Sequence, residues 1–330
     1  MDGITRLPDL ALRTYGGSVV AASDESFAEK ESLIRPGRPG FLPETFGNKG
    51  QVYDGWETRR RREPGHDWAL VRLGLPGVIR GVVIDTAWFK GNYPPRASVE
   101  ATSVAGHPSP AEVLAAPWTE IVPLSDLKGD AEHLFPVTDD ARYTHVRLNI
   151  HPDGGVARLR VHGEVRPDLS LHDGLGIDLA ALANGGLVTA CSDEFYSAPD
   201  NVIAPGLARH QAEGWETARR RDDGNDWIVI RLAGRGVVRL AEIDTTNLLF
   251  NAPGAVALTG LDGDREVELL PRTRLQPDTP HRFRLGAGTP VTHVRVDIYP
   301  DGGLARVRLH GHLHGTWPDP QGPSWPSHER

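Results

Sequence analysis

The chain has 330 residues and a mass of 35.9 kDa, more than one ordinary domain needs, and therefore predicts two domains. Hydrophobic residues make up 39% and no stretch approaches the roughly 18 consecutive apolar residues of a membrane helix, so we expect a soluble protein without membrane contact. A net charge of −8 supplies no basic field, and we expect no nucleic-acid partner. A single cysteine, Cys191, and an N-terminus unlike a secretory signal favour the cytoplasm.

The chain is a tandem repeat. Residues 54–86 and 213–245 align without a gap and share 18 identities in 33 positions. Residues 144–165 and 292–313 match as well, in the same order. Duplication on this scale predicts two copies of one structural unit. We place the first copy at 1–168, the second at 169–313 and a loose, proline-rich tail at 314–330.

Each copy is expected to consist of short strands. Apolar or alternating segments occur in chain order at 68–73, 82–84, 144–150, 227–232 and 292–298. Thirty-seven glycines and 27 prolines separate such segments, and none keeps a helical apolar period. We therefore predict an all-β protein made of two tandem antiparallel β-sandwiches, most simply jelly rolls. Extra residues of the first copy, near 35–49 and within 104–130, are rich in Gly and Pro and predict loops.

A hairpin with one polar face is predicted near the end of each copy. In the first copy, alternating segments flank Pro152-Asp153-Gly154-Gly155, which suits a tight turn. Its polar face would carry Arg147, Arg158 and Arg160 beside His145, Asn149 and His162. Guanidinium groups there could bind a carboxylate by two-point contact, although a solvated sheet face is the simpler alternative for Arg160 and the histidines. The second copy repeats the pattern with Arg295, Asp301 and Arg306.

Two carboxylates per copy border a run of arginines. Glu57 and Glu216 follow a tryptophan just before the run, where a carboxylate could exchange protons while arginines bind an anion. An ion-paired loop brace is the alternative. Asp67 and Asp226 come after the run. His66 precedes Asp67, whereas an asparagine precedes Asp226, so only the first copy titrates near neutral pH at this place.

A lysine-bearing loop distinguishes the first copy. Asp85 ends an apolar strand, which an Asx turn would also explain, and Lys90-Gly91-Asn92 follows it. The chain has only four lysines, so Lys90 is a candidate ligand or acid/base group. The second copy keeps Asn251 but has Leu249 at the lysine position.

The signals for metals and cofactors are weak. His66, Asp67, His151 and Asp153 are possible ligands, but their spacing matches no recognised site, and the sequence has no phosphate loop, serine-hydrolase elbow or dinucleotide fingerprint. We predict no metal and no cofactor.

In order and in duplicate, these motifs resemble those of the allantoicase family over residues 9–313. The resemblance rests on Asp54-Gly55-Trp56-Glu57-Thr58, Gly65-His66-Asp67-Trp68, Ile84-Asp85-Thr86, Phe89-Lys90-Gly91-Asn92-Tyr93-Pro94 and Pro152-Asp153-Gly154-Gly155. It implies galactose-binding-like jelly rolls and hydrolysis of allantoate to ureidoglycolate and urea in purine degradation. Where members of the family commonly repeat Lys-Gly-Asn, the second copy has Leu249-Phe250-Asn251.

Allantoate carries one carboxylate and two ureido arms, so arginines suit its anion and Asn or Asp its amides. We assign catalysis to Glu57 or Asp67 as the base that activates water and to His66 or Lys90 as the acid. Substrate binding is assigned to Asp85, Asn92, Arg147, Asp153, Arg158, Glu216, Asp226, Asn251, Arg295, Asp301 and Arg306. The alternatives are a non-catalytic tandem ligand- or carbohydrate-binding protein and an inactive paralogue. We expect a homo-oligomer.

Overall fold

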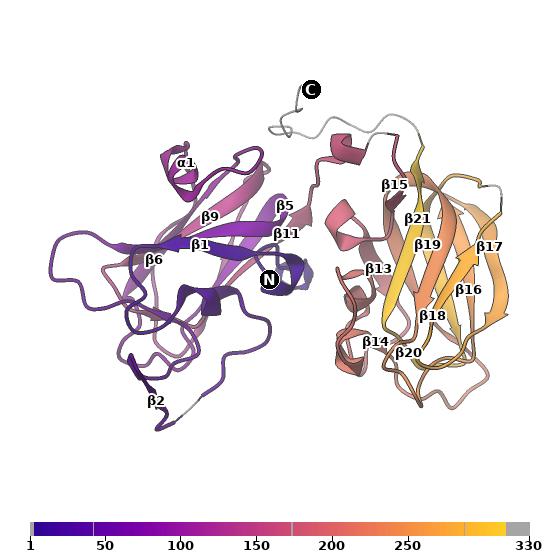
Figure 1. The fold of residues 1–330 in the computed structure, drawn as a ribbon, viewed down its shortest axis with the longest axis horizontal. Helices are drawn as coiled ribbons and strands as arrows, with labels where there is room; N and C mark the ends of the chain where they lie inside the picture. Colours follow the sequence, from indigo (N-terminus) through magenta and orange to yellow (C-terminus); the bar gives the residue numbers. More distant parts are fainter. Residues whose placement is uncertain (1–2, 42, 173, 287, 315–330) are drawn as a thin grey trace. The chain divides into compact units, whose positions relative to one another are not determined.

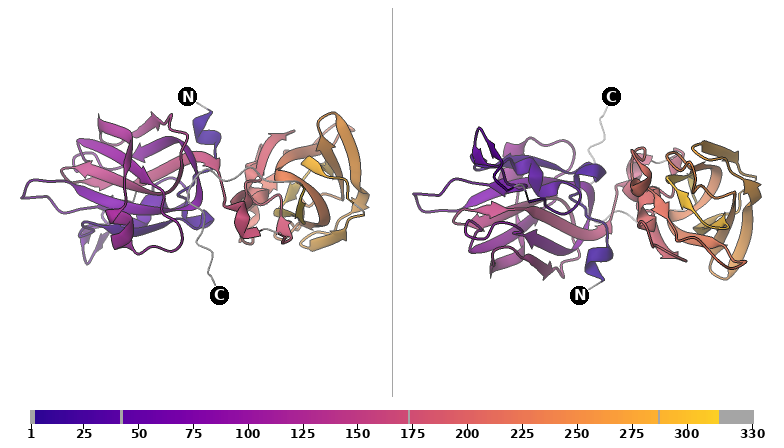
Figure 2. Two further views of the ribbon diagram at one scale, coloured as in Figure 1. Left: turned by 90° about the horizontal axis from the view of Figure 1, so that it is seen from above. Right: turned by 90° about the horizontal axis from the view of Figure 1, so that it is seen from below.

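A computed structural model of the chain describes residues 3–41, 43–172, 174–286 and 288–314. The chain divides into two compact units between Asp168 and Leu169 (Figure 1). Both are built of antiparallel strands, and Figure 2 shows the strands of each unit curving around an interior of their own. The predicted all-β fold of two tandem sandwiches is confirmed. The tail predicted at 314–330 lies, from residue 315 on, outside the described residues.

The described residues of unit 1 form eleven strands, one α-helix and three short 3-10 helices. The strands are β1 (Ser18–Ala22), β2 (Phe46–Gly47), β3 (Gly50–Gln51), β4 (Trp56–Glu57), β5 (Asp67–Asp85), β6 (Arg96–Thr102), β7 (Thr119–Asp126), β8 (Glu132–Pro136), β9 (Arg142–His151), β10 (Gly155–Val156) and β11 (Arg158–Val165). The helices are α1 (Pro110–Ala115), η1 (Ile4–Arg6), η2 (Arg13–Tyr15) and η3 (Lys30–Ile34).

Strand β5 belongs to both layers of the unit 1 sandwich. Its first part pairs with β1 and β9, giving a five-stranded layer in the order β1-β5-β9-β6-β7. Its second part pairs with β11 on one side and β8 on the other, giving a three-stranded layer. The strand bends between Arg72 and Gly77, where the register with β9 shifts. A Cβ on Gly74 would lie 2.4 Å from Gly17 N and Tyr15 O, so only glycine fits this bend.

The bend brings both ends of β5 to the same end of unit 1. Asp67 at its start pairs with Ile150 near the end of β9, and Asp85 at its finish pairs with Arg158 at the start of β11. Only residues 152–157 separate these two partner strands. The core between the layers includes Val146, Leu148 and Leu159, all with 0% exposure.

The predicted hairpin of β9 and β11 is wrong. The two strands follow each other across the Asp-Gly-Gly turn, yet they pair with different parts of β5 and not with each other. Arg147 and Arg158 alternate with core residues along their strands. Their side chains therefore project from the outer faces of opposite layers, and they share no polar face. The arrangement of Arg295 and Arg306 in unit 2 is the same.

The prediction of loops at the two insertions is partly wrong. The first contains β2, which pairs with β3 immediately after it. In the second, α1 forms because Ser109 and Glu112 make a capping box and Pro110 occupies the first turn. The segment around α1 is joined to β9 by the backbone N–H of Val104, which donates to Thr144 Oγ1 at 2.9 Å.

Unit 2 repeats the sandwich. Its strands are β12 (Ile177–Asp178), β13 (Leu187–Cys191), β14 (Trp215–Glu216), β15 (Asp226–Asp244), β16 (Ala255–Asp262), β17 (Arg265–Arg274), β18 (Pro280–Arg284), β19 (Val291–Tyr299), β20 (Gly303–Leu304) and β21 (Arg306–Leu313). Its 3-10 helices are η4 (Leu169–His172), η5 (Leu182–Asn184), η6 (Pro199–Ile203) and η7 (Gln211–Glu213). Strand β15 bends as β5 does, and its two parts join a layer β13-β15-β19-β16-β17 to a layer β12-β21-β15-β18. Among the described residues, no helix has the length and apolar character to cross a membrane.

Candidate functional site

Four loop segments meet where β5 begins and ends, and we call residues 23–28, 54–67, 85–95 and 151–158 the loop end of unit 1. Trp56 anchors it: the ring is fully buried and Nε1 donates to Asp24 O at 2.7 Å. Strand β4 pairs with β10, so Glu57 lies opposite Gly155. A Cβ on Gly155 would lie 2.1 Å from the Phe89 ring, which allows the third segment to pack against this pair. The fold therefore gathers Glu57, Asp67, Asp85, Asn92 and Asp153.

Glu57 is a buried carboxylate with one polar partner. Asn92 Nδ2 donates to Glu57 Oε1 at 2.7 Å, and Asn92 is the only side chain that hydrogen-bonds this carboxylate within the described part of the chain. Burial raises the pKa of Glu57, and the bond from Asn92 offsets part of that effect. A carboxylate with a raised pKa and one engaged oxygen is suited to accept a proton from water.

Asp67 is held more firmly. Its Oδ1 accepts from Ser23 Oγ and Arg61 Nη1, both at 2.9 Å. The backbone N–H of Arg61 donates to Asp153 Oδ2 at 2.7 Å, so one arginine ties both aspartates together. Asp67 is 2% exposed. These contacts describe a brace for the loop end, because they tie Asp67 to two of its segments, through Ser23 and through Arg61.

A pair of histidines borders the loop end. The ring of His66 lies 4.4 Å from that of His151, centroid to centroid. Burial, His66 and Arg96 lower the pKa of His151, in that order. The sequence indicated His151 only as a possible metal ligand. Its contact with His66 could not be predicted, because it depends on the pairing of Asp67 in β5 with Ile150 in β9. No group of three or more His, Cys, Asp or Glu side chains in the described residues is arranged to hold a metal ion.

Arg147 lies on the outer face of the larger layer, next to residues that the sequence did not single out. Its Nε and Nη2 donate to Glu100 Oε2 at 2.9 and 2.7 Å, and its guanidinium lies 4.7 Å from the centre of the Trp118 ring. Asn149 Nδ2 donates to the same Glu100 oxygen at 2.8 Å. Arg147 is thus already paired with a carboxylate, four positions along β9 from His151.

Arg158 is also paired. It is 3% exposed, and its Nη1 and Nη2 donate to Asp54 O at 2.9 Å and Asp54 Oδ2 at 2.7 Å. Asp85 lies opposite Arg158 and accepts the backbone N–H of Ala87 at 2.7 Å, the Asx turn considered above. Burial raises the pKa of Asp85.

Lys90 points to solvent, with 73% of its side chain exposed and Asp130 3.8 Å away.

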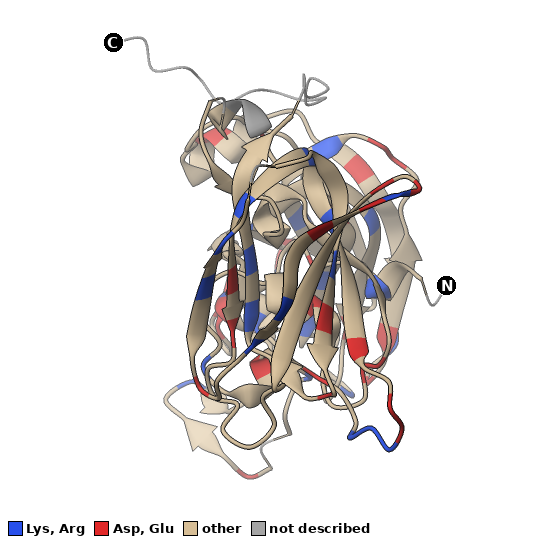
Figure 3. Ribbon diagram, turned by 90° about the vertical axis from the view of Figure 1, so that its right-hand side faces the viewer, with Lys and Arg blue, Asp and Glu red and all other residues tan. Residues whose placement is uncertain are grey.

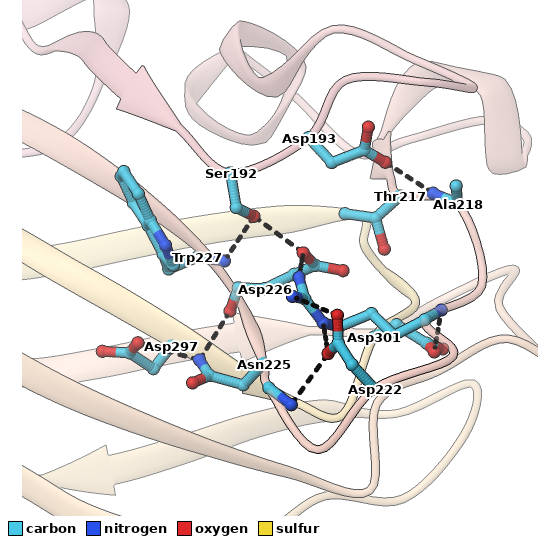
Figure 4. Close-up of polar contacts among 12 residues, drawn as sticks. Ser192, Asp193, Thr217, Ala218, Asp222, Asn225, Asp226, Trp227, Asp297 and Asp301 are labelled. Atoms are coloured by element: carbon cyan, nitrogen blue, oxygen red, sulfur yellow. Dashed lines mark hydrogen bonds and ion pairs between the residues drawn. The ribbon is translucent and has the colours of Figure 1, made fainter.

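Unit 2 has the same framework (Figure 4). Asp226 Oδ1 accepts from Ser192 Oγ at 2.9 Å and from Arg220 Nη1 at 2.6 Å, while the backbone N–H of Arg220 donates to Asp301 Oδ2 at 2.8 Å. Asn251 donates to Glu216 as Asn92 does to Glu57. Since both copies keep these contacts, they account for the shape of the loops in each unit.

Three features separate unit 2 from unit 1. Asn225 stands in the place of His66, and it donates to Asp297 at 2.9 Å instead of contacting an imidazole. Leu249 stands in the place of Lys90. Gln211 Nε2 donates to Glu216 Oε2 at 2.6 Å, so both oxygens of Glu216 are occupied by amides. The buried Arg306 donates to backbone oxygens of Gly206 and Glu213, and Arg295 pairs with Asp297.

The allantoicase repeat family matches residues 8–166 and again residues 177–314. The chain belongs to the allantoicase family. A probable allantoicase of Nocardia farcinica is 61% identical over 320 residues, which cover 95% of this chain and 96% of the relative. A probable allantoicase of Streptomyces avermitilis is 52% identical and covers 94% of this chain and 86% of its own. The crystal structure of allantoicase from Saccharomyces cerevisiae superposes with a TM-score of 0.80 at 34% identity, over 93% of both chains. The family resemblance predicted from the motifs is confirmed.

Proposed function

We propose that the chain hydrolyses allantoate to ureidoglycolate and urea, and that the loop end of unit 1 carries the reaction. Family membership over nearly the whole chain supports the activity. The observation that supports the location is the Glu57–Asn92 pair. Glu57 is buried and has a raised pKa, and among the described residues a side-chain amide binds only one of its oxygens. In Glu216, side-chain amides bind both oxygens.

In the reaction, a water oxygen forms a bond to the central carbon of allantoate while the bond from that carbon to one ureido nitrogen breaks. Glu57 takes the water proton, and an acid delivers a proton to the departing nitrogen. Asn92 acts as a positioning residue that holds Glu57 Oε1 and leaves Oε2 toward the substrate. We prefer Glu57 to Asp67 as the base because Arg61 and Ser23 already hold Asp67.

For the acid we prefer His66 to Lys90. His66 is exposed beside His151, whose lowered pKa keeps that partner neutral near pH 7, so the two rings can lie 4.4 Å apart without a second positive charge beside His66. Lys90 is solvated and its charge is balanced by Asp130.

Within the arginine run at 59–62, Arg59 and Arg61 pair with Asp24 and Asp67, so Arg60 and Arg62 are the members that we propose attract an anionic substrate. Carboxylate binding by Arg147 or Arg158 stays a prediction, and it requires the substrate to replace Glu100 or Asp54 as the arginine partner. Roles for Asp85 and Asp153, and for the unit 2 residues Glu216, Asp226, Asn251, Arg295, Asp301 and Arg306, remain predictions too.

The test is urea release from allantoate by the purified chain and by a matched pair of variants. Glu57→Gln keeps the size and the hydrogen-bond capacity of the side chain but removes the base, and should lower the rate by roughly 10²–10⁴-fold. Glu216→Gln makes the same change in unit 2, where substrate binding but no base is assigned, and should lower the rate far less than Glu57→Gln does. Near-normal turnover by Glu57→Gln would remove Glu57 from the mechanism, and an inactive parent would favour the binding-protein alternative.

We further propose that the protein is cytoplasmic and assembles as a homo-oligomer. One cysteine in 330 residues is compatible with a reducing compartment. Cell fractionation tests the first proposal, and a mass measurement in solution tests the second.

A further inference from the structure

Within the described part of unit 1, the outer face of the larger layer holds buried polar atoms that lack a hydrogen-bond partner. The side chains concerned, which we call the outer-face cluster, are Glu100, Trp118, Arg147, Asn149 and His151. Asn149 is 4% exposed, and its Oδ1 is buried and unpartnered among the described residues. Trp118 Nε1 and His151 Nε2 are buried without a partner in the same set of residues. Since buried polar atoms are nearly always hydrogen-bonded, this face calls for a partner that the chain does not supply.

Hydrogen bonds and a ring contact join these side chains into one cluster. Arg147 Nε and Nη2 donate to Glu100 Oε2, and Asn149 Nδ2 donates to the same oxygen at 2.8 Å. The Arg147 guanidinium lies 4.7 Å from the centre of the Trp118 ring. His151 stands two positions beyond Asn149 on β9, and therefore on the same face. Because Glu100 engages the amide nitrogen of Asn149, Oδ1 is the atom left to bind a ligand.

The segment between β6 and β7, residues 103–118, supplies the tryptophan of the cluster. Thr102 Oγ1 donates to Pro117 O at 2.7 Å, which fixes the residue next to Trp118. In unit 2, residues 263–264 alone join the matching strands β16 and β17, so no counterpart of Trp118 stands between them. The longer connection of unit 1 thus adds an indole N–H to a face that the repeated sandwich does not provide with one.

Unit 2 satisfies the matching position from within the chain. Asp297 stands in the place of Asn149, and it accepts from both Arg295 and Asn225. Figure 3, which looks onto unit 2, shows charges of both signs on its strands. In the described residues, no nitrogen or oxygen of these three unit 2 side chains is buried without a partner. The unpartnered atoms are therefore a property of unit 1 and not of the fold that both units share.

A ureido group has the donors and the acceptor that match these atoms. Its terminal NH2 can donate to Asn149 Oδ1, and its carbonyl oxygen can accept from Trp118 Nε1. Burial acts to raise the pKa of Glu100, but hydrogen bonds from Asn149 and Arg147, with the charges of Arg147 and His66, hold it below its ordinary value. Glu100 is therefore an anion at neutral pH and would repel a carboxylate. The neutral ureido arm of a ureide, and not its carboxylate, suits this face.

We propose that the outer-face cluster of unit 1 binds a ureido group, with Asn149 Oδ1 accepting from its NH2 and Trp118 Nε1 donating to its carbonyl oxygen. The inference rests on the proposed function, which supplies allantoate as the ureide. Arg147 is then a positioning residue that holds Glu100. Because the charge of His66 acts on Glu100, the bound arm lies beside the proposed acid and is the arm that departs as urea.

Titration calorimetry of the full chain with two ligands tests the proposal. N-carbamoylglycine carries one ureido arm and one carboxylate, and N-acetylglycine is its isostere with a methyl group in place of the terminal NH2. The parent should bind N-carbamoylglycine roughly 10-fold more tightly, because the methyl group leaves Asn149 Oδ1 unpaired. Asn149→Ala should reduce this preference.

A conservative variant tests the donor. Trp118→Phe keeps a ring beside Arg147 and removes the indole N–H. It should weaken binding of N-carbamoylglycine, and raise the KM for allantoate, by roughly 3–10-fold with kcat close to that of the parent. Its Tm should stay unchanged, since Nε1 has no partner among the described residues to lose. Trp227→Phe is the matched control, because the Trp227 ring lies at the same 4.7 Å from the Arg295 guanidinium, and it should bind as the parent does.

Equal affinity of the parent for the two ligands, no binding of either, or unchanged affinity in Trp118→Phe would overturn the proposal, even where the parent releases urea from allantoate. A preference for N-carbamoylglycine together with weaker binding by Trp118→Phe would support it. Binding of this kind by a chain that releases no urea would still support the ureido site, and only the proposed hydrolysis would then be wrong.

Discussion

Asp200 in η6 is a partly buried carboxylate that should make unit 2 less stable at neutral pH. Burial raises its pKa from 3.8 to about 6; backbone groups of Val188 and Asp200 itself offset part of this effect, and Glu194 adds to it. Its Oδ1 is buried and has no hydrogen-bond partner in the described residues. In unit 1 the equivalent residue is Glu31, which pairs with Lys30 Nζ at 2.9 Å. The second copy has Pro199 in place of that lysine.

The magnitude follows from the pKa. A rise of about 2 units corresponds to about 3 kcal/mol of unfolding free energy. Because the folded-state pKa lies above the unfolded value, the penalty is fully present above about pH 6 and disappears as the pH falls toward 3.8. Asp200→Asn, which cannot ionise, should therefore stabilise unit 2 by about 2 kcal/mol at pH 8, allowing for the cost of burying an amide. It should have little effect at pH 4.

Scanning calorimetry measures this change, because a gain of about 2 kcal/mol raises the Tm of a unit of this size by roughly 4–8 °C. Glu31→Gln is the matched control. Burial acts to raise the pKa of Glu31, but the hydrogen bond and charge of Lys30, with smaller contributions from its own backbone and Arg13, hold it below its ordinary value, so this variant should lower the Tm of unit 1 at pH 8. A Tm gain for Asp200→Asn that is equal at pH 4 and pH 8, or a loss at pH 8, would refute the reasoning from burial.

Four further predictions concern unit 1. Burial, with a smaller effect of Arg72, lowers the pKa of His145 to about 4, below its unfolded value of 6.5. The free energy of unfolding should therefore fall as the pH drops from 6.5 toward 4. His145→Asn should reduce this loss in unfolding curves recorded across that pH range. Gly154→Ala should destabilise unit 1 by about 1–3 kcal/mol in a thermal melt, since φ is +141° and the new Cβ would lie 2.6 Å from Pro94 N; an unchanged Tm would contradict this. Arg158→Met should lower stability by about 3 kcal/mol, measured by denaturant unfolding, because Asp54 loses its buried arginine partner and keeps only the exposed Arg35, 3.6 Å away, and the backbone N–H of Gly40. The acid limb of kcat/KM for urea release should lie above pH 4.5, because burial raises the pKa of Glu57; a limb at or below 4.5 would argue against Glu57 as the base.

The sequence predicted the fold better than it predicted the site. The repeat and the period of two were sufficient for two sandwiches, because both are local signals. The pairing of β9 was missed because alternation identifies a strand without naming its neighbour. The bend of β5 at Gly74 decides which layer each strand joins, and no pattern at Arg147 or Arg158 reports it.

Local sequence order also explains what was foreseen at the site. Glu57 and Asn92 belong to two separate motifs that occur in the same order in both copies. Their contact follows from the pairing of β4 with β10. The partners Glu100 and Asp54 were not foreseen as such. Ion pairs across 40 or more positions depend on strand register, which the sequence of one strand does not contain.

The arginine of the larger layer keeps its partners by different means in the two copies. In unit 1, Glu100 on the neighbouring strand pairs with Arg147, and Asn149 stands two positions further along β9. In unit 2, Thr259 occupies the position of Glu100, and Asp297, in the position of Asn149, pairs with Arg295. The two copies therefore differ at both positions that surround this arginine. Glu100→Thr alone would leave a guanidinium uncompensated, whereas Asn149→Asp made beforehand would supply its replacement. A stepwise change between the two arrangements is therefore less costly through a form with both acids than through a form with neither. Substitutions that copy one unit's residues into the other should change both positions at once.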